Sequence, residues 1–220
     1  MCSHYQPVTK PEMLKSHFGV EPPVQMGRAD MWPGYEGIFI RRHEHADVGD
    51  EAVPAHEAAL GRWGLIPHWS KDDKVRNTFN ARSETIDTKP SYRDAWRKSQ
   101  RCIVPAMAVF EPDWRSGKAV QARLSLTDEQ PMGIAGLWSA WKSPQGWVQS
   151  FTMLTVNADG HDLMQHLHKP DDEKRMVAIL QPHEFEQWLE GSSTDAVQLI
   201  KRYPADRLVM HSPQGQSLWQ

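Results

Sequence analysis

Cysteine stands at only two positions of this 220-residue chain, and one of them is Cys2, directly after the initiator Met1. An initiator methionine before a small residue is normally trimmed, which would leave a free α-amine beside the Cys2 thiol. Together these groups form a 1,2-aminothiol, which can close a ring on an aldehyde. Position alone favours a small buried residue, so a chemical role for Cys2 requires partners that handle protons and hold a substrate.

Candidate partners for proton transfer are a carboxylate and two imidazoles. Glu111 ends the apolar run "RCIVPAMAVFEP", where it is either a surface residue or a general acid–base in a cleft; taken alone, the surface interpretation is favoured. His166 and His168, in "QHLHKP", precede a second apolar run. Histidine is the usual proton shuttle near neutral pH, so either imidazole could serve Cys2.

A polar group that could hold a substrate occurs in "FNARSET". Asn80, Arg82 and Glu84 stand at every second position, so they share one face if the segment is extended. Asparagine can orient an amine or hydroxyl, and arginine can hold a phosphate through two hydrogen bonds. The plainer interpretation is a turn followed by an ordinary polar strand face.

Other common sites are disfavoured by the sequence. His43 and His45, like the pair in "QHLH", lack a third ligand at a recognisable interval, so we expect no metal and no cofactor. Glycine-rich nucleotide loops and the G-x-S-x-G serine-hydrolase motif are absent from the sequence.

Composition and charge narrow the class of protein. A net charge of −3 argues against coating nucleic acid by bulk charge, but the segment from Lys71 to Arg101 carries nine Lys/Arg against five Asp/Glu. That local excess fits either a basic surface or a solvated charged helix. The sequence has no membrane span and no secretory signal, so we expect a cytoplasmic protein, associated with the nucleoid if bacterial.

The elements that must position these residues are mostly strands. Apolar or alternating runs predict strands around residues 34–43, 59–69, 101–114, 117–128, 131–142, 148–158 and 174–180. Helices are predicted around residues 10–20, 90–100 and 181–191. We therefore expect an α+β fold in one domain over residues 1–220, with a mostly antiparallel, barrel-like sheet and a few flanking helices.

Several blocks, taken in order, resemble one family. They are the initial "MC", "WGLIPHWSKD", "FNARSETI" with "KPSYRDAWRKSQRCIVPA", "FEP", and "HLHKP" with "KRMVAIL". They are similar to the SOS-response-associated peptidase (SRAP) family, also described as abasic-site processing or 5-hydroxymethylcytosine-binding, embryonic-stem-cell-specific proteins. The resemblance runs from about residue 2 to 180. The chain departs from the family pattern at Ser3 and His4, at Asp30, at Pro112 and in the insertion "KPDDEK".

The resemblance implies a DNA-shielding reaction. Such proteins bind single-stranded DNA at an abasic site, and the open-ring sugar aldehyde reacts with the N-terminal cysteine to form a thiazolidine crosslink. Removal of Met1 is then obligatory, and self-removal of that residue explains the peptidase label. A lyase activity is implied as a further step. We expect a monomer that binds abasic single-stranded DNA and no membrane.

The resemblance also implies roles for individual residues. The catalytic residues would be Cys2, Asn80, Glu111 and His168, and the DNA-binding residues would be Arg82, Trp69 and Arg175. Two other functions stay open from the sequence. One is an N-terminal-cysteine peptidase or amidohydrolase acting on other substrates, and the other is a modified-DNA-binding module without chemistry.

Overall fold

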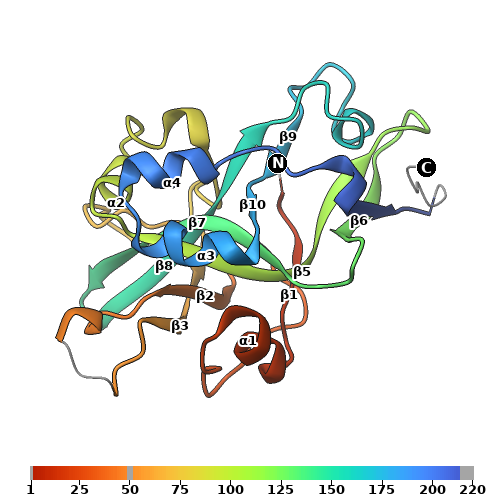
Figure 1. Ribbon diagram of the computed structural model, residues 1–220. Coiled ribbons are helices and arrows are strands. Elements are labelled where there is room, and N and C mark those ends of the chain that lie inside the picture. Colours follow the sequence, from red (N-terminus) through yellow and green to blue (C-terminus); the bar gives the residue numbers. More distant parts are fainter. Residues whose placement is uncertain (1, 49–51, 214–220) are drawn as a thin grey trace.

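The computed structural model describes residues 2–48 and 52–213, and the strands in these ranges form one eleven-stranded sheet (Figure 1). The strands are β1 Tyr5–Pro7, β2 Glu36–Arg42, β3 His56–Trp63, β4 Asn80–Arg82, β5 Arg101–Asp113, β6 Val120–Leu126, β7 Met132–Ser143, β8 Gly146–Asn157, β9 Arg175–Val177, β10 Ile179–Leu180 and β11 Leu208–His211. The α-helices are α1 Pro11–Phe18, α2 Arg93–Arg97, α3 Phe185–Glu190 and α4 Ser193–Leu199. Short 3₁₀ helices are η1 Ala46–Val48, η2 Ser83–Thr85, η3 Met164–His166, η4 Pro182–Glu184 and η5 Ala205–Arg207.

The middle of the sheet closes on itself. Strand β5 pairs with β2 and with β7, β7 pairs with β8, β8 with β3, and β3 with β2. All pairings are antiparallel except those of β8 with β3 and β4. The predicted α+β class, with a mostly antiparallel, barrel-like sheet and few helices, is therefore confirmed.

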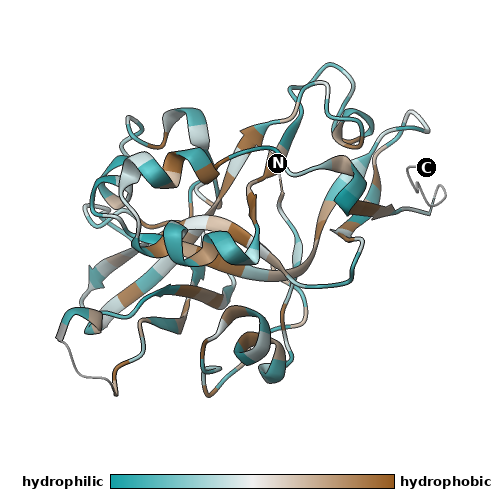
Figure 2. Cartoon of the chain, viewed as in Figure 1, coloured by the Kyte–Doolittle hydropathy of each residue, from teal (hydrophilic) through white to brown (hydrophobic). Residues whose placement is uncertain are grey.

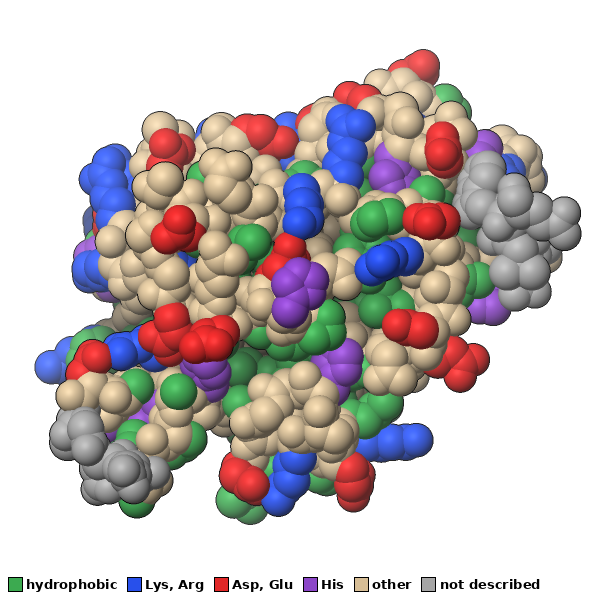
Figure 3. All heavy atoms as spheres, viewed as in Figure 1, with side chains coloured by type: hydrophobic (Ala, Val, Ile, Leu, Met, Phe, Trp, Pro, Cys, Tyr) green, Lys and Arg blue, Asp and Glu red, His purple; other side chains and the backbone are tan. Residues whose placement is uncertain are grey.

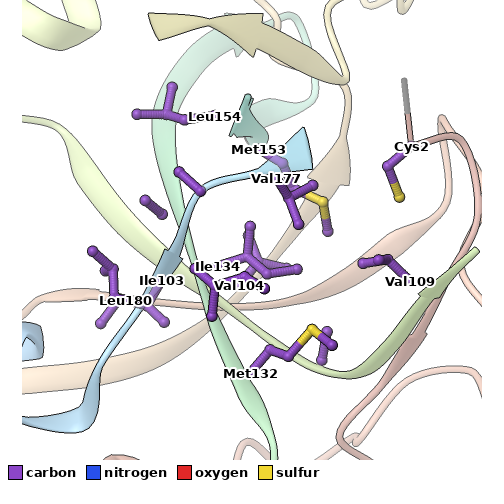
Figure 4. Close-up of a cluster of buried hydrophobic side chains, with 14 of the residues drawn as sticks. Cys2, Ile103, Val104, Val109, Met132, Ile134, Met153, Leu154, Val177 and Leu180 are labelled. Atoms are coloured by element: carbon purple, nitrogen blue, oxygen red, sulfur yellow. The ribbon is translucent and has the colours of Figure 1, made fainter. Parts of the chain in front are cut away.

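Apolar side chains from the crossing strands fill the interior. Hydrophobic residues concentrate in the strands, whereas the connecting loops are largely hydrophilic (Figure 2). Ile103 and Val104 of β5, Ile134 of β7 and Met153 of β8 lie in one buried cluster, and Cys2 stands at its edge (Figure 4). Each such side chain contributes about 1.5–3 kcal/mol by leaving water. In the described ranges, the helices lack the length and apolar character that a membrane crossing requires.

Helix α1 follows from its local sequence. Pro11 occupies the first turn, where its missing N–H leaves no intrahelical bond unmade. Gly19 ends the helix in the left-handed conformation, with φ of 68°, and its N–H donates to the Lys15 carbonyl. The helix predicted around residues 10–20 is therefore confirmed.

Tertiary pairing altered several predicted elements. The segment 80–86 is extended only through β4 and then turns into η2, so Glu84 leaves the strand face that Asn80 and Arg82 share. The segment 174–180 divides into β9, which pairs with β8, and β10, which pairs with β7. Strand β5 continues through Pro105, and the Pro105 carbonyl accepts a hydrogen bond from Val8 N at 3.3 Å.

Substitution of Gly136 tests how closely the strands of the closed ring β5, β7, β8, β3 and β2 pack. It pairs with Cys102 of β5 and Met153 of β8, and an added Cβ would come within 2.5 Å of the Thr152 carbonyl oxygen. Because backbone cannot easily shift there, Gly136→Ala should destabilise the fold by about 1–3 kcal/mol in denaturant unfolding. The control Lys142→Ala, on the exposed end of β7, should change stability by less than about 0.5 kcal/mol. Equal midpoints for Gly136→Ala and the wild type would contradict this packing.

Candidate functional site

The N-terminal segment is held along one edge of β5. Strand β1 pairs antiparallel with β5, Tyr5 lies opposite Val109, and Phe110 N donates to the His4 carbonyl at 3.0 Å. Tyr5 is fully buried, which anchors this short strand. The pairing carries Cys2 to the end of β5 that bears Glu111.

The segment after η3 continues along the same edge of β5. Leu167 forms a β-bridge with Asp113, and His168 N donates to the Pro112 carbonyl at 2.9 Å. His168 has φ of 63°, a left-handed conformation that is uncommon for a residue with a side chain. Its Nε2 lies 2.9 Å from Oε2 of Glu111, and both side chains are buried. The surface interpretation of Glu111 is therefore wrong.

A third element brings Asn80 to the same place. Strand β4 pairs parallel with β8, Asn80 lies opposite Met153, and Tyr92 Oη donates to the Asn80 carbonyl at 2.9 Å. The Asn80 amide then donates through Nδ2 to the Cys2 carbonyl at 2.5 Å. Asn80, Glu111 and His168 thus meet around Cys2, from segments that are far apart in the sequence.

The Cys2 thiol is enclosed and protonated. Only 1% of the residue is exposed, and Sγ donates to the His4 carbonyl at 3.3 Å. Burial, and then the negative charge of nearby Glu111, raise the pKa of the Cys2 thiol far above its ordinary value. The thiol is therefore neutral at physiological pH in this state, and it must lose its proton during any reaction at sulfur.

Two buried polar atoms of the group lack a hydrogen-bond partner among the described residues. Within the described ranges, Asn80 Oδ1 and His168 Nδ1 have no hydrogen-bond partner. Buried polar atoms without partners cost free energy, and native proteins keep few of them.

Arg82 lies beside this group, because Asn80 and Arg82 point to the same face of β4. Its guanidinium forms a 2.6 Å ion pair with Oε2 of Glu173, and about half of its side chain is exposed. Arg175 is only 2% exposed, and it donates to Glu84 at 2.9 and 3.0 Å and to Glu173 at 2.8 Å. The hydrogen bond from Arg175, with a further one from Arg82, lowers the pKa of Glu173 to about 2.

Arg82 and Arg175 therefore differ in their access to a ligand. Arg175 is internal, while Arg82 faces solvent with Glu173 as its partner. Acidic and basic side chains alternate on the face shown in Figure 3, and neither sign gathers into a broad patch. Glu173 belongs to the "KPDDEK" insertion, and sequence reasoning missed it because its contact partners are distant along the chain.

Trp69 occupies a different segment, the loop between β3 and β4. It is 53% exposed and borders a pocket of about 340 Å³. Lys71, Lys74 and Arg76 line the same pocket, so the basic segment predicted from charge surrounds an exposed indole. The structure does not join Trp69 to the Cys2 group by any hydrogen bond within the described ranges.

Two departures from the family pattern meet in space. His4 Nε2 lies 2.9 Å from Oδ1 of Asp30, so the changes at these two positions form one contact. In the sequence the two residues are 26 positions apart, and only the backbone pairing of Tyr5 with Met31 brings them together. Sequence reasoning noted each residue but not the pair.

The candidate metal ligands do not form a site. In the part of the chain that the structure describes, no three His, Cys, Asp or Glu side chains are placed to hold a metal ion. His43 and His45 lie in the loop between β2 and β3, with ring centroids 5.7 Å apart.

Comparisons with known proteins agree with this geometry. Residues 1–214 match the family model described as SOS response associated peptidase (SRAP). Abasic site processing protein YoqW of Bacillus subtilis is 34% identical over 66% of this chain and 64% of its own length. Abasic site processing protein HMCES of Gallus gallus is 30% identical over 68% of this chain and 50% of its length. The chain thus spans about half to two-thirds of these relatives.

A solved structure extends the likeness over the whole fold. The crystal structure of a protein from Bordetella bronchiseptica is 45% identical, has a TM-score of 0.86, and covers 96% of this chain and 99% of that one. The sequence match, the shared fold and the residues gathered at the end of β5 lead to one conclusion: the chain belongs to the SOS response associated peptidase (SRAP) family.

Proposed function

We propose that this protein binds single-stranded DNA at an abasic site and forms a covalent thiazolidine crosslink through Cys2 once Met1 is removed. The observation that carries the proposal is the convergence of Asn80, Glu111 and His168 on Cys2 at the end of β5. Met1 lies outside the described residues, so its removal rests on the chemistry alone. A blocked amine cannot condense with an aldehyde.

The reaction balances without a cofactor. The Cys2 amine attacks C1′ of the open-ring sugar, and one water leaves as the imine forms. Sulfur then adds to the imine carbon, and the thiol proton passes to the ring nitrogen. The carbonyl oxygen therefore departs as water, and the five-membered ring holds C1′ through both a C–N and a C–S bond.

The buried groups suit these proton transfers. Glu111 lies close enough to Cys2 for its charge to raise the thiol pKa, so the carboxylate is placed to accept that proton. His168 is hydrogen-bonded to Glu111 at 2.9 Å and can pass a proton to the departing oxygen. Asn80 holds the Cys2 carbonyl and thereby orients the amine.

The DNA would be held by groups around this centre. Arg82 would bind the phosphate next to the lesion, displacing Glu173 from its guanidinium. Arg175 would keep Glu84 and Glu173 in place beneath Arg82, a change from its predicted direct contact with phosphate. Trp69 would stack on a base, with Lys71 and Lys74 near the backbone. The protein would act as a monomer in the cytoplasm.

The two alternative functions fit the site less well. A cysteine peptidase or amidohydrolase uses a thiolate, whereas burial and Glu111 raise the pKa of the Cys2 thiol. A DNA-binding module without chemistry does not require the buried Glu111–His168 pair beside a cysteine.

The first test uses purified protein and a single-stranded oligonucleotide with one natural abasic site, resolved on a denaturing gel. The wild type, shown by intact mass to lack Met1, should give a shifted band. Cys2→Ala should give none, because no sulfur closes the ring, while the matched thiol variant Cys102→Ala should keep the band. A heat-stable adduct of Cys2→Ala would rule out the proposed chemistry.

Glu111→Gln separates proton transfer from DNA binding. The amide preserves the shape of the side chain but cannot accept the thiol proton. Single-turnover crosslinking should slow by about 10²–10⁴-fold, with little change in the Kd for DNA that carries an unreactive abasic analogue. Glu186→Gln, an exposed carboxylate on α3, is the control and should react at the wild-type rate. A normal rate for Glu111→Gln would remove Glu111 from the proton path.

The ion pair between Arg82 and Glu173 predicts opposite effects of two substitutions. Arg82→Ala should weaken DNA binding and reduce the salt slope, d log K/d log[salt], by about 0.7, because one phosphate contact is lost. Glu173→Gln should tighten binding, because the competing carboxylate is neutralised. Asp171→Asn removes the same charge two residues away and controls for bulk charge. Equal tightening by Glu173→Gln and Asp171→Asn would show that net charge, and not the Arg82 contact, is responsible.

A further inference from the structure

Three aromatic rings form a continuous stack beside the Cys2 group. The ring of Phe110 lies 4.0 Å from that of His4 with an interplanar angle of 10°, and His4 lies 4.2 Å from Trp32 with an angle of 7°. His4 is buried, whereas Trp32 is 42% exposed. The stack therefore runs from strand β5 outward and ends at an accessible indole.

The middle ring of the stack cannot turn. His4 Nε2 is hydrogen-bonded to Oδ1 of Asp30 at 2.9 Å, and Nδ1 is hydrogen-bonded to Nε2 of Gln121 at 2.9 Å. With both nitrogens engaged and both faces covered, His4 has no atom left to bind a phosphate. Its role is to support Trp32 from below.

The backbone also fixes Trp32 in place. The preceding residue, Met31, is fully buried and exchanges two hydrogen bonds with Tyr5, at 2.9 and 3.2 Å. The loop that bears Trp32 is thereby tied to the segment that bears Cys2. A rigid aromatic surface loses little conformational entropy when a ligand stacks on it.

The stack lies next to the reacting residue. The His4 carbonyl accepts the Cys2 thiol hydrogen bond at 3.3 Å, and Phe110 directly precedes Glu111 in β5. Two residues of extended chain span at most about 7 Å, so the middle ring of the stack is attached close to Cys2, and Trp32 lies one ring further out.

We propose that the exposed face of Trp32 is a stacking site for the nucleobase that adjoins the abasic site. This inference rests on the proposed function. An abasic site leaves its neighbouring base without a stacking partner on one side, and the indole supplies one. An indole can stack on any of the four bases, and a protein that binds abasic sites in any sequence context requires such tolerance. Asp30, beside the stack, disfavours a phosphate there, which leaves the flat uncharged face of a base as the matching chemistry.

The site is separate from that of Trp69. Trp32 lies in the loop between α1 and β2, whereas Trp69 lies in the loop between β3 and β4 and borders the basic pocket. Trp69 is surrounded by lysine and arginine, whereas Trp32 is supported by the stacked rings of His4 and Phe110. The two indoles would therefore contact different parts of the bound strand.

The test removes the base instead of the protein side chain. Wild-type protein is titrated with single-stranded oligonucleotides that carry one tetrahydrofuran abasic analogue, which cannot crosslink. In matched oligonucleotides, the 5′ or the 3′ neighbour is also replaced by tetrahydrofuran. Loss of one neighbouring base should raise the wild-type Kd by about 5- to 100-fold, the usual range for one base–aromatic stack. Neither the fold nor Cys2 is altered in this comparison.

Variants then assign the effect to Trp32. Trp32→Ala should bind all the oligonucleotides weakly and with equal Kd values. Trp32→Phe should regain part of the difference in Kd between oligonucleotides with and without the neighbouring base. Trp147→Ala is the matched control, because the Trp147 indole is also exposed but lies far from the Cys2 group. Met153 of β8 pairs with Asn80, and Trp147 precedes Met153 by six residues on the same strand, which is about 20 Å. The Trp147→Ala variant should show the same ratio of Kd values as the wild type between oligonucleotides with and without the neighbouring base. Thermal unfolding of each variant checks that the fold is kept.

The outcomes distinguish this inference from the proposed function. If the wild type crosslinks natural abasic DNA but binds the analogue equally well with and without the neighbouring bases, the stacking site is wrong and the crosslinking function stands. If Trp32→Ala loses as much affinity as the wild type when the neighbouring base is removed, the stacking site is likewise wrong and the crosslinking function stands. If the wild type without Met1 forms no adduct at all, the proposed function fails and this inference fails with it.

Discussion

The pairing of β1 with the end of β5 is the interaction on which the site depends. An N-terminal segment normally frays, because few contacts hold it. Here Tyr5 and Val8 are completely buried, and backbone hydrogen bonds join this segment to β5. The strand ring in turn fixes β5, through its pairing with β2 and β7. A residue that would otherwise be mobile is thereby held against Glu111.

The cost of this arrangement is a set of polar groups in the interior. Cys2, Asn80, Glu111 and His168 are all buried, and each is kept in place by at least one hydrogen bond. Low polarity around them strengthens the influence of Glu111 on the thiol. The same environment keeps sulfur protonated, so a substrate must supply the driving force for proton transfer.

Charged side chains pair in a local network near the site, and the protein as a whole has only a small net charge. The net charge of −3 leaves little general attraction for nucleic acid. Instead, Arg175 is buried between Glu84 and Glu173, and Glu173 in turn meets the exposed Arg82. The network orients the guanidinium of Arg82 at the surface, where Glu173 is its ion-pair partner.

The sequence by itself determined the elements that local patterns encode: helix α1, strand β2 and the long strands β5 to β8. Through its resemblance to the SRAP family, the sequence also pointed to Cys2, Asn80, Glu111 and His168 as candidate site residues. Only the tertiary structure decided that Glu84 turns away after Arg82, that Glu173 pairs with Arg82, and that His4 stacks between Phe110 and Trp32. These contacts join residues up to 106 positions apart in the sequence. They are determined by strand register and burial, and a local sequence pattern contains no information about either.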